Sequence, residues 1–423
     1  MTSIIDSFVE DAKAVTIVEC LDVMHLPRPK GKQAEYIGPC PLSGGKDRFS
    51  YNIRKNVWNC RGCNEGGHGA LGLAGHVLGL DLKKRDGFLA ACSAVLGQPI
   101  PDKTLVESEE QQKAREEALR KKQALAKRDQ EKKQKQAEFY RQRERKIAVS
   151  KWKDGRFLAS TPYEQYIERR SGALQSVWPL RVLENEPYFH NNKKIYSGPA
   201  IVAPFVAQDG DIIGCHLTWV DLSNPPKYRP RLIDEDTGEK LATKKMRGTK
   251  KGGIIPLFGF IYRHGKFHAA PDRYRMVVGE GIETVLAMRF ADGERDDTIY
   301  AAAGDLGNFT GPATPDSRFK HPELKHSGKD GKLRPIYVAG PVPLITNASD
   351  SIWIPDHVTE LVLIADGDSE PIMTASAMAR AKARFSRPNR KIPVLWPLRG
   401  MDIADMVIKP TPPENTDKTG GGG

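Results

Sequence analysis

The 423-residue sequence predicts a multidomain α/β protein. Three observations lead to this fold class. Cysteines cluster near the N-terminus, a stretch dominated by Glu, Gln, Lys, Arg and Ala follows, and apolar strand-like runs alternate with helix-compatible segments toward the C-terminus. We expect a cysteine-rich β domain at 1–100, a charged helical linker at 101–150, a basic α+β domain at 151–262, a Rossmann-like domain at 263–408 and a disordered tail at 409–423.

The charge balance of the chain suits a polyanionic partner. Lys and Arg number 65 and Asp and Glu 53, which gives a formal net charge of +12. Such an excess is typical of proteins that bind nucleic acid, although generally basic soluble proteins share it. No apolar run is long enough to span a bilayer, and the first residues lack the features of a signal peptide, so we expect a cytoplasmic protein without a membrane partner.

The N-terminal region contains a hairpin with a cysteine motif at each end. Alternating residues predict strands at 49–53 and 57–59, Cys40 precedes the first strand, and Cys60 and Cys63 follow or end the second. A Cys-x-x-Cys motif that meets another ligand pair across a hairpin is how a zinc ribbon is built. Because three of the six cysteines gather here, a metal is favoured over disulfides, and we expect a structural Zn²⁺.

The fourth zinc ligand is open. Ser43 stands where a second ligand of the first motif is expected, and three thiolates alone do not close a structural site. The alternatives are His68, His25, a water molecule and, weakly, Ser43 itself. Of these we expect His68, in Gly66-Gly67-His68-Gly69. The other interpretation is a metal-free remnant of a ribbon with buried thiols.

Basic and aromatic residues along the hairpin are candidates for nucleic-acid binding. Lys46 and Arg48 can contact phosphates, and Trp58 can stack on unpaired bases. Trp58 and Phe49 have a second interpretation, in which they fill the small core of this domain.

The charged region from about 101 to 149 predicts a long solvated helix between two domains. It contains strong helix formers, such as those in 114–122, without a wide apolar stripe. Charges of both signs are typical of a solvated face, so nucleic-acid binding by this helix is the less favoured alternative.

The region 151–262 predicts a compact α+β piece. A short helix at 163–171 ends at Gly172, and strands at 200–205 and 212–220 flank a turn, which indicates a hairpin. A loop dense in cations and glycine follows at 244–253. Its candidates for contacts to phosphates are Lys244, Lys245, Arg247 and Lys250. The alternative is an exposed basic loop without a ligand.

The C-terminal region predicts a mostly parallel sheet. Apolar runs predict strands at 277–278, 298–304, 361–365 and 391–396. Helix-compatible segments at 284–290 and 373–385 alternate with these strands, and an irregular insertion lies at about 308–355. Regular alternation of strand and helix is typical of parallel sheets.

Acidic residues follow two of these strands directly. Glu280 comes after the first, and Asp366 and Asp368 come after the third. The carboxyl ends of strands form the ligand-binding edge of an open α/β sheet, where three carboxylates repel one another unless a cation lies between them. Oxygen ligands suit Mg²⁺ or Mn²⁺, so the sequence predicts a metal-dependent phosphoryl-transfer site. In the alternative, Asp366 and Asp368 only cap the next helix. Glu283 is interpreted as a helix-start residue favoured by the helix dipole.

Two groups of motifs resemble a known family. Glu280-Gly281-Ile282-Glu283-Thr284 and Asp366-Gly367-Asp368 resemble the Glu-Gly and Asp-x-Asp motifs of the Toprim fold. Cys40-Pro41, Gly44-Gly45-x-Asp47-Arg48-Phe49 and Cys60-Arg61-Gly62-Cys63 resemble the zinc-binding domain of DnaG-type DNA primases, in the version found in phage and plasmid primases. The order of the regions is also similar, so the resemblance covers most of residues 1–408.

The resemblance implies a primosome enzyme, a DNA-directed RNA polymerase that makes short RNA primers from ribonucleoside triphosphates on single-stranded DNA. It implies that Glu280, Asp366 and Asp368 are catalytic and hold Mg²⁺ or Mn²⁺, together with Asp402 after the last strand. The cations of 244–250 would face nucleotide phosphates and template. Because no Gly-x-x-x-x-Gly-Lys-[Ser/Thr] phosphate loop occurs, the replicative helicase would be a separate chain.

Two features depart from the family pattern. Ser43 replaces a zinc ligand, and Glu370-Pro371 stands where many primases have a glycine after the Asp-x-Asp pair. Two other functions stay open at this point. One is a Toprim-type metal-dependent nuclease, and the other is a non-catalytic zinc-ribbon regulator that binds DNA.

Overall fold

The computed structural model describes residues 4–32, 34–102, 109–173, 177–327 and 333–408. The expected disordered tail at 409–423 lies outside the described residues. The chain divides into two compact units, Met1–Glu131 and Lys132–Gly423. Both contain helices and sheets, so the predicted mixed α/β class is confirmed.

The first unit is an antiparallel sheet with helices around it. Its strands follow one another in the sheet: β1 (Lys30–Lys32), β2 (Glu35–Cys40), β3 (Gly44–Asn52), β4 (Val57–Cys60) and β5 (Glu65–His68). The helices are α1 (Ile4–Ala14), α2 (Ile17–Val23), α3 (Gly69–Leu78) and α4 (Arg85–Leu96). Strands β3 and β4 form the predicted hairpin, in which Tyr51 pairs with Trp58.

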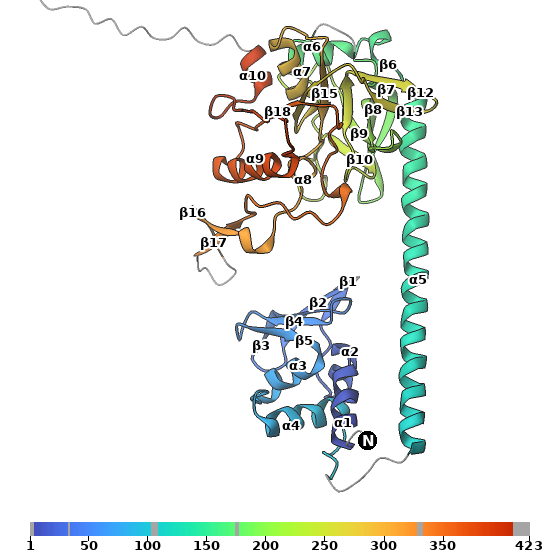
Figure 1. The fold of residues 1–423 in the computed structure, drawn as a ribbon, viewed down its shortest axis with the longest axis vertical. Coiled ribbons are helices and arrows are strands. Elements are labelled where there is room, and N and C mark those ends of the chain that lie inside the picture. Colours follow the sequence, from blue (N-terminus) through green and yellow to red (C-terminus); the bar gives the residue numbers. More distant parts are fainter. Residues whose placement is uncertain (1–3, 33, 103–108, 174–176, 328–332, 409–423) are drawn as a thin grey trace, which may run out of the picture. The chain divides into compact units, whose positions relative to one another are not determined.

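Helix α5 (Glu109–Asp154) runs across the division between the units. The predicted charged helix therefore exists and continues four residues beyond its expected end. Its last turns enter the core of the second unit through Ala148 and Trp152. The Trp152 ring packs against Tyr262 and Phe267, and its Nε1 donates a hydrogen bond of 2.7 Å to the Pro179 carbonyl oxygen. Figure 1 shows α5 in turquoise.

The second unit contains an antiparallel sheet with strand order β10-β9-β8-β7-β6. Its members are β6 (Arg156–Phe157), β7 (Arg181–His190), β8 (Lys193–Val206), β9 (Ile212–Trp219) and β10 (Lys244–Gly248). Strands β8 and β9 form the expected hairpin, and α6 (Glu164–Ser171) ends at Gly172, whose φ of 70° suits a residue without a Cβ. The segment 244–253 was expected to be a basic loop, but its first half is the edge strand β10, which pairs with β9.

A second sheet in the same unit has the strand order β11-β15-β14-β18-β19. Strands β14 (Arg275–Gly279), β15 (Thr298–Ala302), β18 (Glu360–Ile364) and β19 (Val394–Leu395) are parallel, as predicted. Strand β11 (Ile255–Phe258) joins β15 in the antiparallel direction. This strand ties the expected 151–262 region to the sheet of the 263–408 region.

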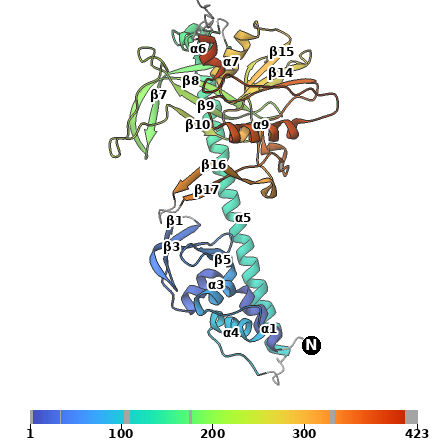
Figure 2. The same cartoon turned by 90° about the vertical axis from the view of Figure 1, so that its left-hand side faces the viewer.

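Helices cover both faces of this sheet (Figures 1 and 2). On one face, Val277 packs with Val285 and Leu286 of α7 (Ile282–Ala291). On the other face, Val278 packs with Met378 and Ala381 of α9 (Pro371–Phe385). A strand buried on both faces reads as a continuous apolar run, which explains why the sequence around Val277 shows no alternation.

Smaller elements complete the second unit. They are the pair β12 (Phe260–Arg263) and β13 (Lys266–Ala269), α8 (Leu306–Thr310), the pair β16 (Phe319–Ser327) and β17 (Leu333–Val338), α10 (Ile403–Ile408), and three 3-10 turns at 158–160, 315–317 and 348–350. The insertion expected to be irregular thus contains the β16–β17 ribbon, with register shifts between Lys320 and Lys325.

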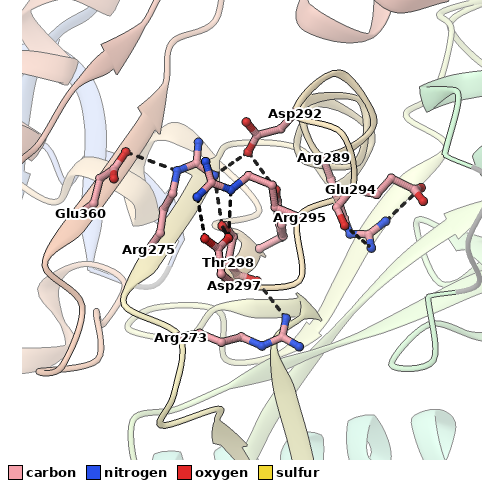
Figure 3. Close-up of polar contacts among 10 residues, drawn as sticks. Arg273, Arg275, Arg289, Asp292, Glu294, Arg295, Asp297, Thr298 and Glu360 are labelled. Atoms are coloured by element: carbon pink, nitrogen blue, oxygen red, sulfur yellow. Dashed lines mark hydrogen bonds and ion pairs between the residues drawn. The ribbon is translucent and has the colours of Figure 1, made fainter.

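An ionic network lies at the amino ends of the parallel strands (Figure 3). Arg275, the first residue of β14, forms ion pairs with Asp292 and Glu360 and donates 3.2 Å to the Thr298 hydroxyl. Close by, Arg295 pairs with Asp297 at 2.6 Å. Each acid of this network therefore faces an arginine of the protein itself.

Candidate functional site

Four predicted acids line one pocket of about 200 Å³. Glu280 follows β14, Asp366 and Asp368 follow β18, and Asp402 precedes α10. The pocket therefore lies at the carboxyl ends of two neighbouring parallel strands, where open α/β sheets bind their ligands. The structure brings together the four carboxylates that the sequence singled out.

The loop that carries Asp366 and Asp368 depends on Gly367. Its carbonyl oxygen accepts a hydrogen bond of 2.8 Å from the Gly400 amide. A Cβ on Gly367 would lie 2.2 Å from the Met401 carbonyl oxygen, closer than two such atoms approach. Only glycine lets this loop pack against the segment before Asp402, and this contact sets Asp402 beside the pair.

Two carboxylic acids of the pocket, Glu280 and Asp368, have raised pKa values. Burial raises the pKa of Glu280, and the charges of Asp366 and Asp305 add to the effect. A hydrogen bond with Asp366, burial, and the charges of Asp366 and Asp402 together raise the pKa of Asp368 to about 6. Carboxylates that disfavour one another's ionisation are a fitting donor set for a divalent cation.

The four acids share a pocket without converging as tightly as a closed metal site does. Within the described ranges, the one group of three or more His, Cys, Asp or Glu residues whose ligand atoms lie within 4.8 Å of one another is a cysteine cluster of the first unit. Mg²⁺ commonly keeps several water ligands and takes only one or two carboxylates, so a looser set of oxygens suits it.

Cations line the same pocket as the acids. Arg170, Arg229 and Lys244 line it together with Glu283. Glu283 is buried and accepts hydrogen bonds from the Tyr166 hydroxyl at 2.7 Å, from Arg229 Nη2 at 2.7 Å and from Lys244 Nζ at 2.9 Å. Although burial opposes ionisation, the charges of Lys244 and Arg229 hold the pKa of Glu283 well below its usual value. Glu283 does lie in the first turn of α7, but its contacts make it the centre of an ionic network.

A second, larger pocket of about 770 Å³ adjoins the first. The described residues that line it include five cations and no acid: Lys227, Arg229, Arg231, Lys240 and Lys244. Two of these, Arg229 and Lys244, line both pockets. An acidic pocket and a cationic pocket therefore meet at a shared wall. Arg229 is not among the residues predicted from the sequence, although the basic segment at 227–231 is visible there.

The other three predicted phosphate contacts have partners inside the protein. Lys245 Nζ lies 3.7 Å from the centre of the Tyr188 ring and donates to the Phe189 carbonyl oxygen. Arg247 pairs with Glu144 at 3.1 Å, and Lys250 pairs with Asp305. Of the four cations expected to face a ligand, Lys244 is the one that lines the two pockets.

The cysteine cluster of the first unit consists of Cys40, Cys60, Cys63 and His76. The Cys40 Sγ lies 3.8 Å from the Cys63 Sγ and 3.7 Å from the His76 Nε2. Zinc–sulfur bonds of about 2.3 Å at tetrahedral angles place two sulfurs about 3.8 Å apart. The cluster could therefore hold a zinc ion, as the sequence predicts.

The expectation that His68 is the fourth zinc ligand is wrong, because His76 lies in the cluster instead. His68 is exposed at the end of β5, where it pairs with Val57, whereas His76 is buried two turns into α3. Ser43 lies beside the cluster, since its hydroxyl is 3.2 Å from the Cys63 Sγ and its amide donates to the Cys40 Sγ at 3.3 Å. Burial opposes ionisation of Cys40, yet hydrogen bonds from Ser43 and His76 bring its pKa to about 6.

A carboxylate orients the histidine of the cluster. Glu65 bonds to the Nδ1 of His76, so the Nε2 faces the sulfurs. A carboxylate on the distal nitrogen is the usual partner of a zinc-bound histidine. The Trp58 ring stacks on the His76 ring at 4.8 Å and is 5% exposed, so its expected role in stacking on bases is wrong and its core role is right. Lys46 and Arg48 are exposed.

A family model described as a domain of unknown function, DUF7146, matches residues 142–257. No curated protein matches the chain. In the described part of the chain, no helix is both long and apolar enough to cross a membrane.

Solved structures similar to this chain are those of DNA primases. The zinc-binding and RNA polymerase domains of the Aquifex aeolicus primase are 12% identical, with a TM-score of 0.30, over 96% of this chain and 82% of that chain. A DNA primase domain from Pseudomonas aeruginosa is 12% identical, with a TM-score of 0.31, over 62% of this chain and 74% of that chain.

Proposed function

We propose that this protein is a DNA primase of the phage and plasmid type with a Toprim catalytic domain, which synthesises short RNA primers from ribonucleoside triphosphates on single-stranded DNA. The observation that carries the proposal is the shared wall of Arg229 and Lys244 between an acidic and a cationic pocket. Nucleotidyl transfer needs both, because acids hold divalent cations while basic residues bind the phosphates that react.

The acidic pocket would hold the catalytic cation. Glu280, Asp366 and Asp368 are its proposed ligands, with Asp402 as a further acid. When bound, Mg²⁺ or Mn²⁺ offsets negative charge at the reacting phosphate and lowers the pKa of the primer 3′-hydroxyl. Gly367 contributes by holding the Asp366–Asp368 loop against the segment that precedes Asp402.

The cationic pocket would bind the triphosphate of the incoming nucleotide. Its volume of about 770 Å³ lies within the range of pockets that enclose small organic ligands. Glu283 fixes Arg229 and Lys244 by ion pairs at 2.7 and 2.9 Å, so both cations are held in place before a nucleotide enters. Fixed cations at the boundary would set the α-phosphate beside the acidic pocket.

The first unit would contact the template. A structural zinc at Cys40, Cys60, Cys63 and His76 would fix the sheet on which Lys46 and Arg48 are exposed. The helicase that accompanies such an enzyme would be a separate protein.

Primer synthesis by the purified full-length chain tests the proposal. With single-stranded DNA, the four ribonucleoside triphosphates and Mg²⁺, we expect short RNA products. The substitution Asp366→Ala should reduce their yield at least about 1000-fold, because it removes a proposed ligand of the catalytic cation. Asp316→Ala, at an exposed acid outside the pocket, is the control and should keep full activity. Full activity of the Asp366 variant would remove the site from the mechanism.

The same preparation separates the other functions. Cleavage of DNA without ribonucleotides, dependent on Asp366 and Mg²⁺, would make the protein a nuclease. DNA binding without synthesis or cleavage, unchanged after loss of Glu280, Asp366 and Asp368, would make it a regulator.

A further inference from the structure

One side of helix α5 in the second unit combines cations with exposed aromatic rings. We call it the α5 stripe, and it consists of Lys132, Lys135, Phe139, Tyr140, Arg143 and Lys146. Steps of three and four residues place Lys132, Lys135, Phe139, Arg143 and Lys146 above one another on a single face, and Tyr140 is adjacent to Phe139.

The two rings are unusually open for large apolar side chains. Phe139 is 64% exposed and Tyr140 53%. Their ring centres lie 5.9 Å apart and their planes are inclined at 70°, which is an edge-to-face arrangement. Exposed single apolar residues are ordinary, but two adjacent aromatic residues flanked by cations are a typical stacking surface.

Two acids of this part of the helix pair with arginines that do not belong to the stripe. Glu138 pairs with Arg141 at 3.0 Å, and Glu144 pairs with Arg247 at 3.1 Å. Among the residues that the structure describes, no acid lies within ion-pair distance of Lys135, Arg143 or Lys146. Lys135, Arg143 and Lys146 therefore carry positive charge that no ion pair with a described acid offsets.

These features select the kind of partner. A second copy of the helix would set like charges against each other, and the stripe lacks the repeated apolar positions of a coiled coil. A strand of nucleic acid complements it in both respects, because its phosphates match the cations and its unpaired bases can stack on the rings.

We propose that the α5 stripe binds single-stranded nucleic acid, with phosphates on Lys135, Arg143 and Lys146 and bases on Phe139 and Tyr140. This deepens the proposed function, on which the identity of the strand as template rests. Binding itself does not require nucleotides or a divalent cation, so it is tested without primer synthesis.

Fluorescence anisotropy of a labelled single-stranded oligonucleotide with the full-length chain, without Mg²⁺ and ribonucleotides, measures the contact. Phe139→Ala/Tyr140→Ala should weaken binding at least about tenfold, because each stacked base is lost, whereas Phe139→Trp/Tyr140→Trp should preserve it. Leu125→Ala, at a 62% exposed apolar residue of the same helix, is the matched control and should change little.

The salt dependence tests the cations separately. Lys135→Gln/Arg143→Gln/Lys146→Gln should flatten the slope of log affinity against log salt by about 2, since each single-strand phosphate contact contributes roughly 0.7. Arg141→Gln/Lys193→Gln/Lys194→Gln removes the same charge from other exposed positions and should leave the slope nearly unchanged.

Three results would overturn the proposal. They are unchanged binding by the aromatic variant, an equal loss in the stripe and control triple variants, and an equal loss for duplex and single strand in the aromatic variant. Asp366→Ala should bind the oligonucleotide normally, so failure of primer synthesis and failure of the stripe are told apart.

Discussion

The acidic residues at the two ends of the parallel sheet have opposite kinds of neighbour. At the amino ends, Asp292, Asp297 and Glu360 each face an arginine of the protein (Figure 3). At the carboxyl ends, Glu280, Asp366 and Asp368 line one pocket, where burial and neighbouring acids raise the pKa of Glu280, and neighbouring acids and burial raise the pKa of Asp368. Acids that the protein neutralises itself stabilise the fold, whereas acids left to repel one another are available to an external cation.

The cysteine cluster of the first unit is a third group of side chains that could bind a cation. Substitution of one of its ligands should have the largest effect on stability. Loss of a structural zinc site removes on the order of 10 kcal/mol of binding energy that supports folding. We expect His76→Ala to lose the metal and unfold the first unit, and His68→Ala to keep one zinc per chain. Atomic emission and circular dichroism measure both. Zinc retained in the His76 variant and lost in the His68 variant would reverse our assignment of the ligand.

Glu283 is the exception at the carboxyl end, because it is an acid that cations do neutralise. Glu283→Gln leaves Arg229 and Lys244 without their buried counter-charge, which we expect to cost about 3 kcal/mol of stability. If the two cations orient phosphates, the KM for ribonucleotides should rise about tenfold more than kcat falls. Steady-state kinetics and thermal unfolding measure these effects. A loss of stability with unchanged KM would make the network purely structural.

Arg275 tests the amino end of the sheet. Its side chain is 11% exposed, and Arg275→Ala leaves Asp292 without its arginine. We expect a loss of about 2 to 3 kcal/mol in the free energy of unfolding, while the activity of each folded molecule stays near that of the unchanged protein. Chemical denaturation and primer synthesis at low temperature measure the two quantities. A large fall in activity without a fall in stability would contradict the contrast between the two ends.

The smallest expected effect is a pH dependence that differs between the ends. The pKa of Asp368 is raised to about 6, so without metal its contribution to stability is present below about pH 4 and is lost as pH rises through 6. The pKa of Asp297 is lowered, so its contribution is lost as pH falls below about 4. Both side chains are exposed and screened by solvent, so each effect stays below about 1 kcal/mol.

Thermal unfolding of Asp368→Asn between pH 4 and 7, without divalent cations, measures the first effect. This variant should lose less stability than the unchanged protein as pH rises, and Mg²⁺ should reduce the difference between them. The matched variant Asp297→Asn should differ from the unchanged protein mainly through lower stability near neutral pH.

The sequence predicts those features that follow from local pattern. Buried parallel strands and the acids directly after them are visible as apolar runs that end in carboxylates, and the pocket contains all four predicted acids. Features that depend on distant parts of the chain are not visible. His76 lies beside the Cys40 thiol only because α3 packs against the sheet. Arg229 forms a hydrogen bond with Glu283, which is 54 residues away in the sequence.

Two residues expected to contact nucleic acid have partners inside the protein for a common physical reason. Trp58 and Lys245 have side chains of the types that contact nucleic acid. The same types of side chain also fill a hydrophobic core, as a tryptophan does, or pack over an aromatic ring, as a lysine does. In the structure, Trp58 stacks on His76 and Lys245 lies over Tyr188. Residue type alone does not separate the two uses, because the decision depends on which face of the strand is covered.

The contact at Gly367 has a consequence for synthesis of the protein. The acidic pocket takes Glu280 from one strand, Asp366 and Asp368 from another, and Asp402 from a segment that follows the last strand of the sheet. Domains fold as the chain leaves the ribosome, beginning with its N-terminal part. The pocket therefore gains its fourth acid only after residue 402 has emerged, so the first unit can fold on the ribosome before the acidic pocket is complete.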